Sequence, residues 1–259
     1  MKTVSLIQSL SAREIRERYK NSLLGVLWAL LTPLSMLALY AFVFVYIFDA
    51  RWPALQAGGS KIEFVLILFS GITTHQIVAE ILSRAPTIVT SNKSYVTKIV
   101  FPLWILVPVS ALSALFNGLV SFCALLLCVI VTGVEFQWTT IFLPLIILPL
   151  LVMSAGIAWF LAALGVYIRD VGQVLPPLIT GMLFLAPIFF PRTALPEQIE
   201  RWIVLNPVTI PVEQVHRVVF YGELPLVSDL GIYSLIACMV AVVGYLFFRL
   251  AKRGFADVL

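Results

Sequence analysis

The sequence predicts an all-α integral membrane protein that crosses the bilayer six times. Of its 259 residues, 61% are hydrophobic and only 12% are charged, whereas soluble domains carry roughly 45–50% apolar and about 25% charged residues. Because so few charges cannot cover a globular surface, lipid is the solvent that fits this composition. No linker, repeat or low-complexity tract divides the chain, so residues 1–259 are expected to form one transmembrane domain.

The predicted spans are apolar segments long enough to cross the hydrocarbon core, which takes roughly 20 residues of helix. They are helical because lipid offers no hydrogen-bond partner to a free backbone group. In chain order they are Trp28–Phe48, Phe64–Leu82, Leu103–Val131, Ile141–Tyr167, Val174–Phe190 and Leu230–Arg249. Residues 28–190 therefore hold spans one to five, residues 230–250 hold span six, and residues 251–259 form a tail.

The basic residues set the orientation, because Lys and Arg gather on the cytoplasmic side of membrane proteins. With the N-terminus inside, twelve of the 17 Lys and Arg residues lie on the cytoplasmic side and five lie outside. Both termini are therefore expected in the cytoplasm, which agrees with an even number of spans. A positive charge distributed in this way indicates membrane topology rather than a nucleic-acid partner.

The N-terminal segment, residues 1–27, is predicted to be an amphipathic helix that lies along the lipid headgroups. Between residues 4 and 24, apolar side chains such as Ile15 and Leu23 fall on one face at helical spacing, and charged side chains fall on the other. Its basic residues either anchor the helix to anionic lipid or also hold a phosphate-bearing substrate or a cytoplasmic partner.

Two connections differ from plain loops. Residues 83–100 form a polar cytoplasmic connection that is either a solvated loop or a docking element for a cytoplasmic motor. Residues 191–229 form a long external connection with an apolar stretch that Asn206, Pro207 and Pro211 interrupt. Because this stretch is too polar for two spans and too apolar for a free loop, we expect re-entrant external helices between spans five and six.

The sequence lacks the motifs of ATP hydrolysis and of metal or nucleophilic catalysis. It has no G-x-x-x-x-G-K-[ST] phosphate loop, no H-E-x-x-H motif and no Cys/His set at metal-ligand spacing. We therefore predict no catalytic residue, no metal site and no cofactor in this chain. His75 and Glu80 are too few for a proton relay through span two, and Asn117 is predicted to hydrogen-bond between helices.

Several short motifs, taken in chain order, resemble those of the permeases of polysaccharide-export ABC transporters. They are REIRERYKNSLLGVLWALLTPL (Arg13–Leu34), KIVFP (Lys98–Pro102), GVYIRDVGQVLPPLI (Gly165–Ile179), APIFFP (Ala186–Pro191), LNPVT (Leu205–Thr209) and KRGFADVL (Lys252–Leu259). Together they cover essentially the whole chain. The resemblance implies a multi-pass half-transporter of the bacterial inner membrane, in which two copies form the pathway and two separate cytoplasmic subunits bind ATP and Mg. The implied cargo is a glycan on a polyprenyl-diphosphate or related lipid: O-antigen by preference, otherwise capsule or teichoic acid.

The resemblance also assigns residues to three roles. The lipid headgroup is expected to meet Arg13, Arg16, Arg18 and Lys20. Coupling to the motor is expected at Arg84, Asn92, Lys93, Tyr95, Lys98, Arg169 and Asp170. The channel and its external gate are expected at Phe42, Tyr46, Phe189, Phe190, Trp202, Asn206, Pro207, Glu213 and Arg217.

Two other functions stay open at this point. An ion-driven flippase or secondary transporter predicts paired charges near the bilayer centre and often an internal repeat, and the sequence shows neither. A membrane-embedded enzyme acting on lipid-linked sugars would need convergent acids or a metal site. The isolated Arg169–Asp170 pair is better explained as an orienting group in a cytoplasmic turn.

Overall fold

The computed structural model describes residues 2–20, 22, 24–47, 61–93, 95, 101–192 and 202–258. Within these ranges the regular secondary structure is helical and contains no strand. The α-helices are α1 (Lys2–Tyr19), α2 (Trp28–Ala41), α3 (Lys61–Arg84), α5 (Leu106–Thr132), α6 (Leu143–Tyr167), α7 (Val171–Phe184), α9 (Thr209–Val219), α10 (Val227–Ala251) and α11 (Phe255–Val258). Shorter 3-10 or π turns precede or extend several of them.

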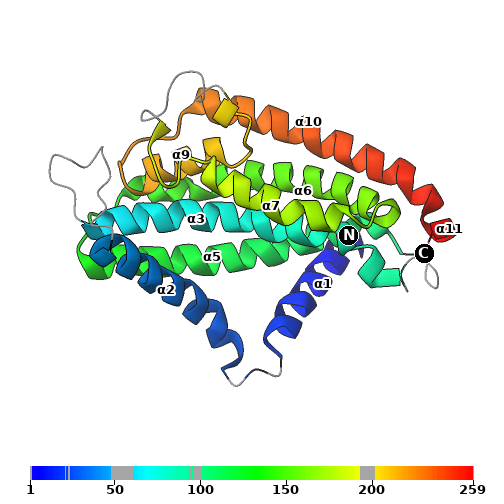
Figure 1. Ribbon diagram of the computed structural model, residues 1–259, viewed down its shortest axis with the longest axis horizontal. Coiled ribbons are helices and arrows are strands. Elements are labelled where there is room, and N and C mark those ends of the chain that lie inside the picture. Colours follow the sequence, from blue (N-terminus) through cyan, green and yellow to red (C-terminus); the bar gives the residue numbers. More distant parts are fainter. Residues whose placement is uncertain are drawn as a thin grey trace.

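Helices α3, α5, α6, α7 and α10 form a bundle, whereas α1 and α2 form a V whose apex points away from it (Figure 1). The free arm of α1 returns to pack against α5, and α2 contacts both α3 and α5. Helix α1 begins and α11 ends at the same end of the bundle (Figure 1), which is the arrangement that an even number of crossings produces.

In the part of the chain that the structure describes, four helical segments are long and apolar enough to cross a membrane: Lys61–Thr87, Leu103–Thr132, Trp138–Tyr167 and Val227–Gly254. They coincide with predicted spans two, three, four and six. Predicted spans one and five correspond to shorter apolar helices, Trp28–Phe44 and Val171–Phe184. The structure thus confirms an all-helical protein with long apolar helices, while a sixfold crossing stays a prediction.

The fifth predicted span is shifted relative to the structure. Helix α7 begins at Val171 and ends at Phe184, so Phe189 and Phe190 lie in the turns that follow it and not at its end. Pro187 explains this early end, because a proline disfavours helical backbone at the residue before it. At the first span, α2 continues from Phe42 to Ile47 as a π-helix.

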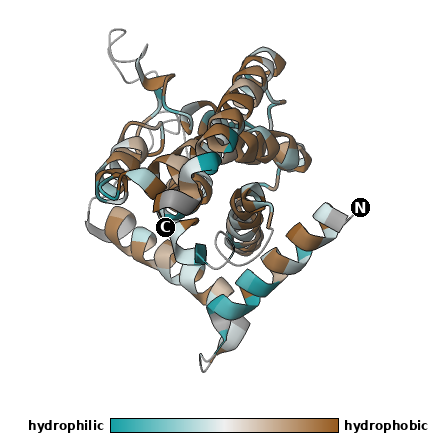
Figure 2. Cartoon of the chain, turned by 90° about the vertical axis from the view of Figure 1, so that its right-hand side faces the viewer, coloured by the Kyte–Doolittle hydropathy of each residue, from teal (hydrophilic) through white to brown (hydrophobic). Residues whose placement is uncertain are grey.

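The bundle exposes apolar side chains on its outer helices and buries its central helix. In the most apolar stretch of Lys61–Thr87, 78% of the residues are buried, against 22% in Val227–Gly254. Large apolar residues such as Val131, Leu148 and Val243 stay exposed. Figure 2 shows hydrophobic colour over most of the bundle, with hydrophilic residues on α1, the helix that begins at the label N. An outer surface of this kind suits lipid contact.

The predicted external segment contains one long described helix, α9, which packs against α3 and α6. Thr139 Oγ1 donates to the carbonyl of Val218 at 2.6 Å, and Tyr233 donates to the carbonyl of Pro207 at 2.8 Å. Residues 193–201 lie outside the described residues. Residues 206–220 of the interrupted apolar stretch are therefore largely covered by protein, whereas Trp202 and Leu205 are exposed. Coverage of this kind is what irregular backbone at membrane depth requires, while its dip into the outer leaflet stays a prediction.

Helices α6 and α10 pack closely together at two glycines, Gly156 and Gly244. A Cβ atom on Gly156 would lie 2.6 Å from the backbone nitrogen of Ala241, and one on Gly244 would collide with the carbonyl of Gly156. Because small residues let helix backbones approach closely in membranes, these two glycines fix the distance between α6 and α10.

We expect Gly244→Leu to force α10 away from α6 and to destabilise the folded protein by about 1–3 kcal/mol, the usual cost of overpacking. Thermal unfolding of the purified protein in detergent measures the effect. The matched control is Gly231→Leu on the same helix, where an added Cβ meets no atom within 4 Å. Equal melting temperatures for the two variants would contradict the role given to Gly244.

Candidate functional site

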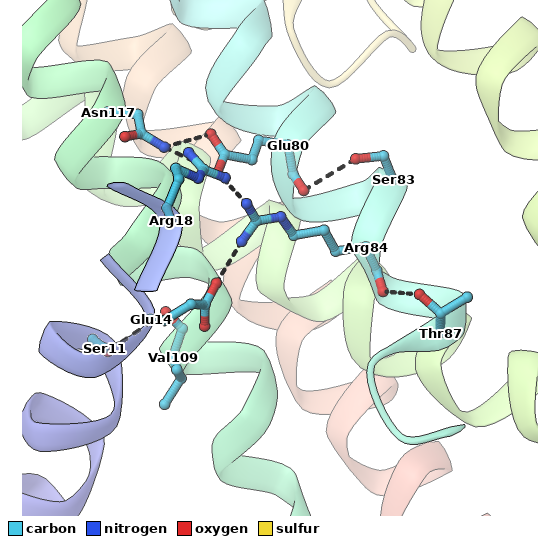
Figure 3. Close-up of polar contacts among 9 residues, drawn as sticks. All are labelled: Ser11, Glu14, Arg18, Glu80, Ser83, Arg84, Thr87, Val109 and Asn117. Carbon is cyan, nitrogen blue, oxygen red and sulfur yellow. Dashed lines mark hydrogen bonds and ion pairs between the residues drawn. The ribbon is translucent and has the colours of Figure 1, made fainter. Parts of the chain in front are cut away.

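Charged side chains from α1 and from the C-terminal part of α3 meet beside α5 (Figure 3). Arg18 of α1 contacts Glu80 of α3. Arg84, one turn further along α3, lies 2.9 Å from the same Glu80 oxygen and also contacts Glu14 of α1. Asn117 of α5 donates to both Glu80 oxygens, at 3.0 and 2.9 Å. We refer to these five residues as the ionic cluster.

The local sequence explains why these groups meet. Glu14 and Arg18 are four residues apart on α1, and Glu80 and Arg84 are four residues apart on α3, so each pair lies on one face of its helix. The contacts join Arg18 to Glu80 and Glu14 to Arg84, so the two pairs face each other in opposite order. Each acid therefore meets a base of the other helix.

The ionic cluster is less exposed than an ordinary surface ion pair, so the loss of one partner has a larger effect on stability. The Glu80 side chain is only 11% exposed, and those of Arg18 and Arg84 are each 32% exposed. Removing one partner from such a site leaves a poorly solvated charge behind, which costs more than the pair itself contributes. Burial also raises the pKa of the Glu14 carboxyl, a shift that the Ser113 hydroxyl and the Arg18 charge oppose.

The predicted headgroup residues do not gather in one place. Arg18 enters the ionic cluster, whereas Arg13 pairs with Glu17 on its own helix at 2.7 Å. Arg16 donates from Nε to the carbonyl of Ala12 and is exposed, as Lys20 is. Because Glu80 lies 62 positions after its partner Arg18, the sequence indicates this division only through the i, i+4 pairs of opposite charge on each helix.

Three of the predicted motor-coupling residues line one cleft of about 340 Å³ between α1 and the segment that follows α3: Arg84, Asn92 and Tyr95. Asn92 donates to the carbonyl of Ile88 at 2.8 Å, which stabilises this segment. Lys93 is exposed and does not line the cleft, and Lys98 lies outside the described residues.

Arg169 and Asp170 lie apart from that cleft, exposed in the turn between α6 and α7. The α6 end nevertheless contacts the same connection, because a Cβ atom on Gly165 would lie 2.6 Å from Cα of Pro86. Sequence reasoning assigned the coupling role to the charged pair and overlooked this glycine. The described part of the connection is thus held between α1 and α6.

The predicted channel and gate residues divide among several places. Glu213 and Arg217 line a cavity of about 570 Å³ with Arg192 and Glu223, and two ion pairs cross it, Arg192–Glu213 at 3.6 Å and Arg217–Glu223 at 2.8 Å. Asn206 donates a hydrogen bond to a backbone carbonyl of α7, and the Pro207 carbonyl accepts one from a tyrosine of α10. The Phe189 ring stacks on Phe184, and Phe190 is half-buried. The side chains of Phe42 and Trp202 are exposed. The side chain of Tyr46 lies outside the described part of the structure. These residues therefore do not form a single gate in one chain.

We expect Glu80→Ala to leave Arg18 and Arg84 without their shared carboxylate and to destabilise the α1–α3 contact by about 1–3 kcal/mol. Faster amide hydrogen exchange in α1, together with a lower melting temperature, measures this loss. Glu17→Ala serves as the control, because its exposed pair with Arg13 contributes at most about 1 kcal/mol. Exchange in α1 that is the same for both variants would contradict the assignment.

Comparison with known proteins agrees with the motif resemblance. The ABC-2 type transporter family matches residues 5–220. The chain is 22% identical to the O-antigen export system permease protein RfbA of Myxococcus xanthus, over 97% of this chain and 94% of the relative. It is 26% identical to the polysialic acid transport protein KpsM of Escherichia coli, over 96% and 94%. It is 23% identical to the RfbA protein of Klebsiella pneumoniae, over 98% and 95%. Since the family match spans most of the chain, this protein belongs to the ABC-2 type transporter family.

Proposed function

We propose that this chain is the transmembrane permease of an ATP-driven exporter that moves a lipid-linked polysaccharide across the bacterial inner membrane. The observation that carries the proposal is end-to-end similarity to export permeases, over more than nine-tenths of both chains. Two of those relatives are named for O-antigen and one for polysialic acid. The Arg169–Asp170 motif and the APIFFP stretch resemble O-antigen and teichoic-acid exporters more than capsule exporters, and we assign O-antigen first because two relatives are named for it.

The assembly we propose has two copies of this chain and two cytoplasmic ATP-binding subunits that hold ATP and Mg. The sequence supports a separate ATPase because it contains no phosphate loop. Both termini lie in the cytoplasm in this proposal, supported by the bias of basic residues and by the common end of α1 and α11 (Figure 1). The end that carries the ionic cluster then faces the ATPase.

We propose that movement of the ATP-binding subunit is transmitted to this chain at the cleft lined by Arg84, Asn92 and Tyr95, which we call the coupling cleft. Arg84 is the last residue of α3, lines the cleft, and contacts Glu14 of α1 and Glu80 of α3. Pro86, two residues later, packs against Gly165 of α6. A push on the segment after α3 would therefore reach α1, α3 and α6 together, because close-packed elements transmit strain.

At the opposite end, the cavity around Glu213 and Arg217 supports an external gate. The Arg192–Glu213 pair joins the segment after α7 to α9. The Arg217–Glu223 pair joins α9 to the turn that follows α9. Outward movement of α7 would separate the first pair without breaking the second. The headgroup of the lipid carrier would first meet the exposed basic residues of α1, Arg13, Arg16 and Lys20.

The ionic cluster argues against an ion-driven flippase as the second candidate. Its acids and bases lie at the α1 end of the bundle (Figure 3) and each has an opposite charge as partner. A proton relay needs ionisable groups distributed across the membrane.

We expect Ser91→Trp to block the coupling cleft, which Ser91 lines, and to abolish both copurification of the ATP-binding subunit and surface polysaccharide. Thr132→Trp, at the far end of α5, replaces another small exposed hydroxyl residue and should preserve both. The assay is coexpression with the ATP-binding subunit in cells that synthesise the glycan but lack their own exporter, followed by affinity purification and surface glycan detection. Export that continues without any ATP-binding subunit would contradict the proposal.

A further inference from the structure

A cavity of about 440 Å³ lies between α2, α3 and α5, next to the ionic cluster. Its walls are mostly apolar and include Ala29 and Met36 of α2 and Phe69 and Ile72 of α3. Arg18, Glu80 and Asn117 of the ionic cluster also line it, together with the uncharged polar side chains of Thr32, Thr73, Gln76 and Ser121. The cavity therefore has the character of a site for an amphiphile, with charged groups beside mostly apolar walls.

The arrangement of the helices accounts for this cavity. Helices α1 and α2 form a V beside the bundle (Figure 1), and α2 contacts α3 and α5 while the side chains leave this cavity between them. Empty apolar space costs contacts that a bound chain would restore. Met36 is exposed as well as lining the cavity, so the cavity is accessible from outside α2.

We propose that this cavity binds an anionic phospholipid of the bilayer, with its phosphate at Arg18 and one acyl chain between α2 and α3. The site serves a resident lipid rather than the cargo of the proposed exporter. Bound there, the lipid would fill the space between α2 and α3 and link α2 to the ionic cluster through its headgroup.

The charges at the mouth favour an anion with oxygen acceptors. Arg18 and Arg84 are balanced by Glu80 and Glu14, while Arg16 and Lys20 add exposed positive charge to the same end of α1. The partly exposed Arg18 guanidinium contacts Glu80 through one nitrogen, and a guanidinium presents five N–H donors in a fork that matches phosphate. A second cavity, of about 520 Å³, reaches Arg18 from the side of α7.

Size and lining favour one lipid chain over a glycan. Ligand cavities usually measure about 300–1,000 Å³, and this one is near the lower limit. A polysaccharide would need polar partners along its length, whereas the α2 wall is mainly apolar, with Thr32 and Tyr40 as its polar side chains.

Native mass spectrometry of the full-length protein, purified in detergent and titrated with phosphatidylglycerol, tests the proposal. We expect Arg18→Gln to lower retained phosphatidylglycerol by about tenfold, the value of one charge-assisted hydrogen bond to phosphate. Ala29→Phe, which fills the cavity but leaves the ionic cluster intact, should lower it similarly. The control Arg249→Gln removes one exposed charge of α10 that does not line the cavity, and it should retain the wild-type amount.

Several results would overturn the assignment. Equal retention by Arg18→Gln and Arg249→Gln would show that net charge alone attracts the lipid. Unchanged retention by Ala29→Phe would show that no chain enters the cavity, and this variant remains decisive if Arg18→Gln fails to fold. Binding of palmitate as tight as that of phosphatidylglycerol would exclude a phosphate site. Displacement of the phospholipid by equimolar polyprenyl phosphate would assign the cavity to the carrier lipid instead.

Discussion

The arrangement of the cytoplasmic end, as we propose it, depends on two oppositely ordered charge pairs. Glu14 and Arg18 on α1 meet Arg84 and Glu80 on α3, and Asn117 ties the shared carboxylate to α5. This contact joins α1, which also packs against α5, to the most buried helix of the bundle. The coupling cleft borders Glu14 and Arg84, and the cavity beside α2 borders Arg18, Glu80 and Asn117.

In this position the ionic cluster would make α1 and α3 move together. A charged contact of low exposure resists gradual deformation, because partial separation leaves its groups poorly solvated. Movement received by the segment after α3 would therefore shift α1 and α3 as a unit. The glycine contacts have a complementary role: Gly165 fixes the same segment against α6, and Gly156 and Gly244 fix α6 against α10. Together these contacts form a continuous path from the cleft to the outer helix of the bundle.

The sequence predicted features that depend on composition along the chain, and it failed where distant side chains pair. Runs of apolar residues located the long helices to within a few positions, and the motif resemblance identified the family. The end of α7 was misplaced because apolar character continues through Phe189 and Phe190 after Pro187 has ended the helix. The expectation that Arg18 meets a lipid headgroup rests on its basic neighbours, and it did not include the acidic partner that the fold brings to this side chain. Only the fold shows that Glu80 reaches it, although i, i+4 pairs of opposite charge on both segments offered a signal.

Reversal of the charges tests the central claim most directly. Glu14→Arg with Arg18→Glu reverses the pair on α1, and Glu80→Arg with Arg84→Glu reverses the pair on α3, while Asn117 can offer its carbonyl to an arginine in place of a carboxylate. Surface polysaccharide is then measured in cells that carry either reversed pair or both. The account predicts that each reversed pair alone abolishes export and that the fourfold variant restores a substantial part of it. Export by the fourfold variant no better than by either reversed pair would contradict it.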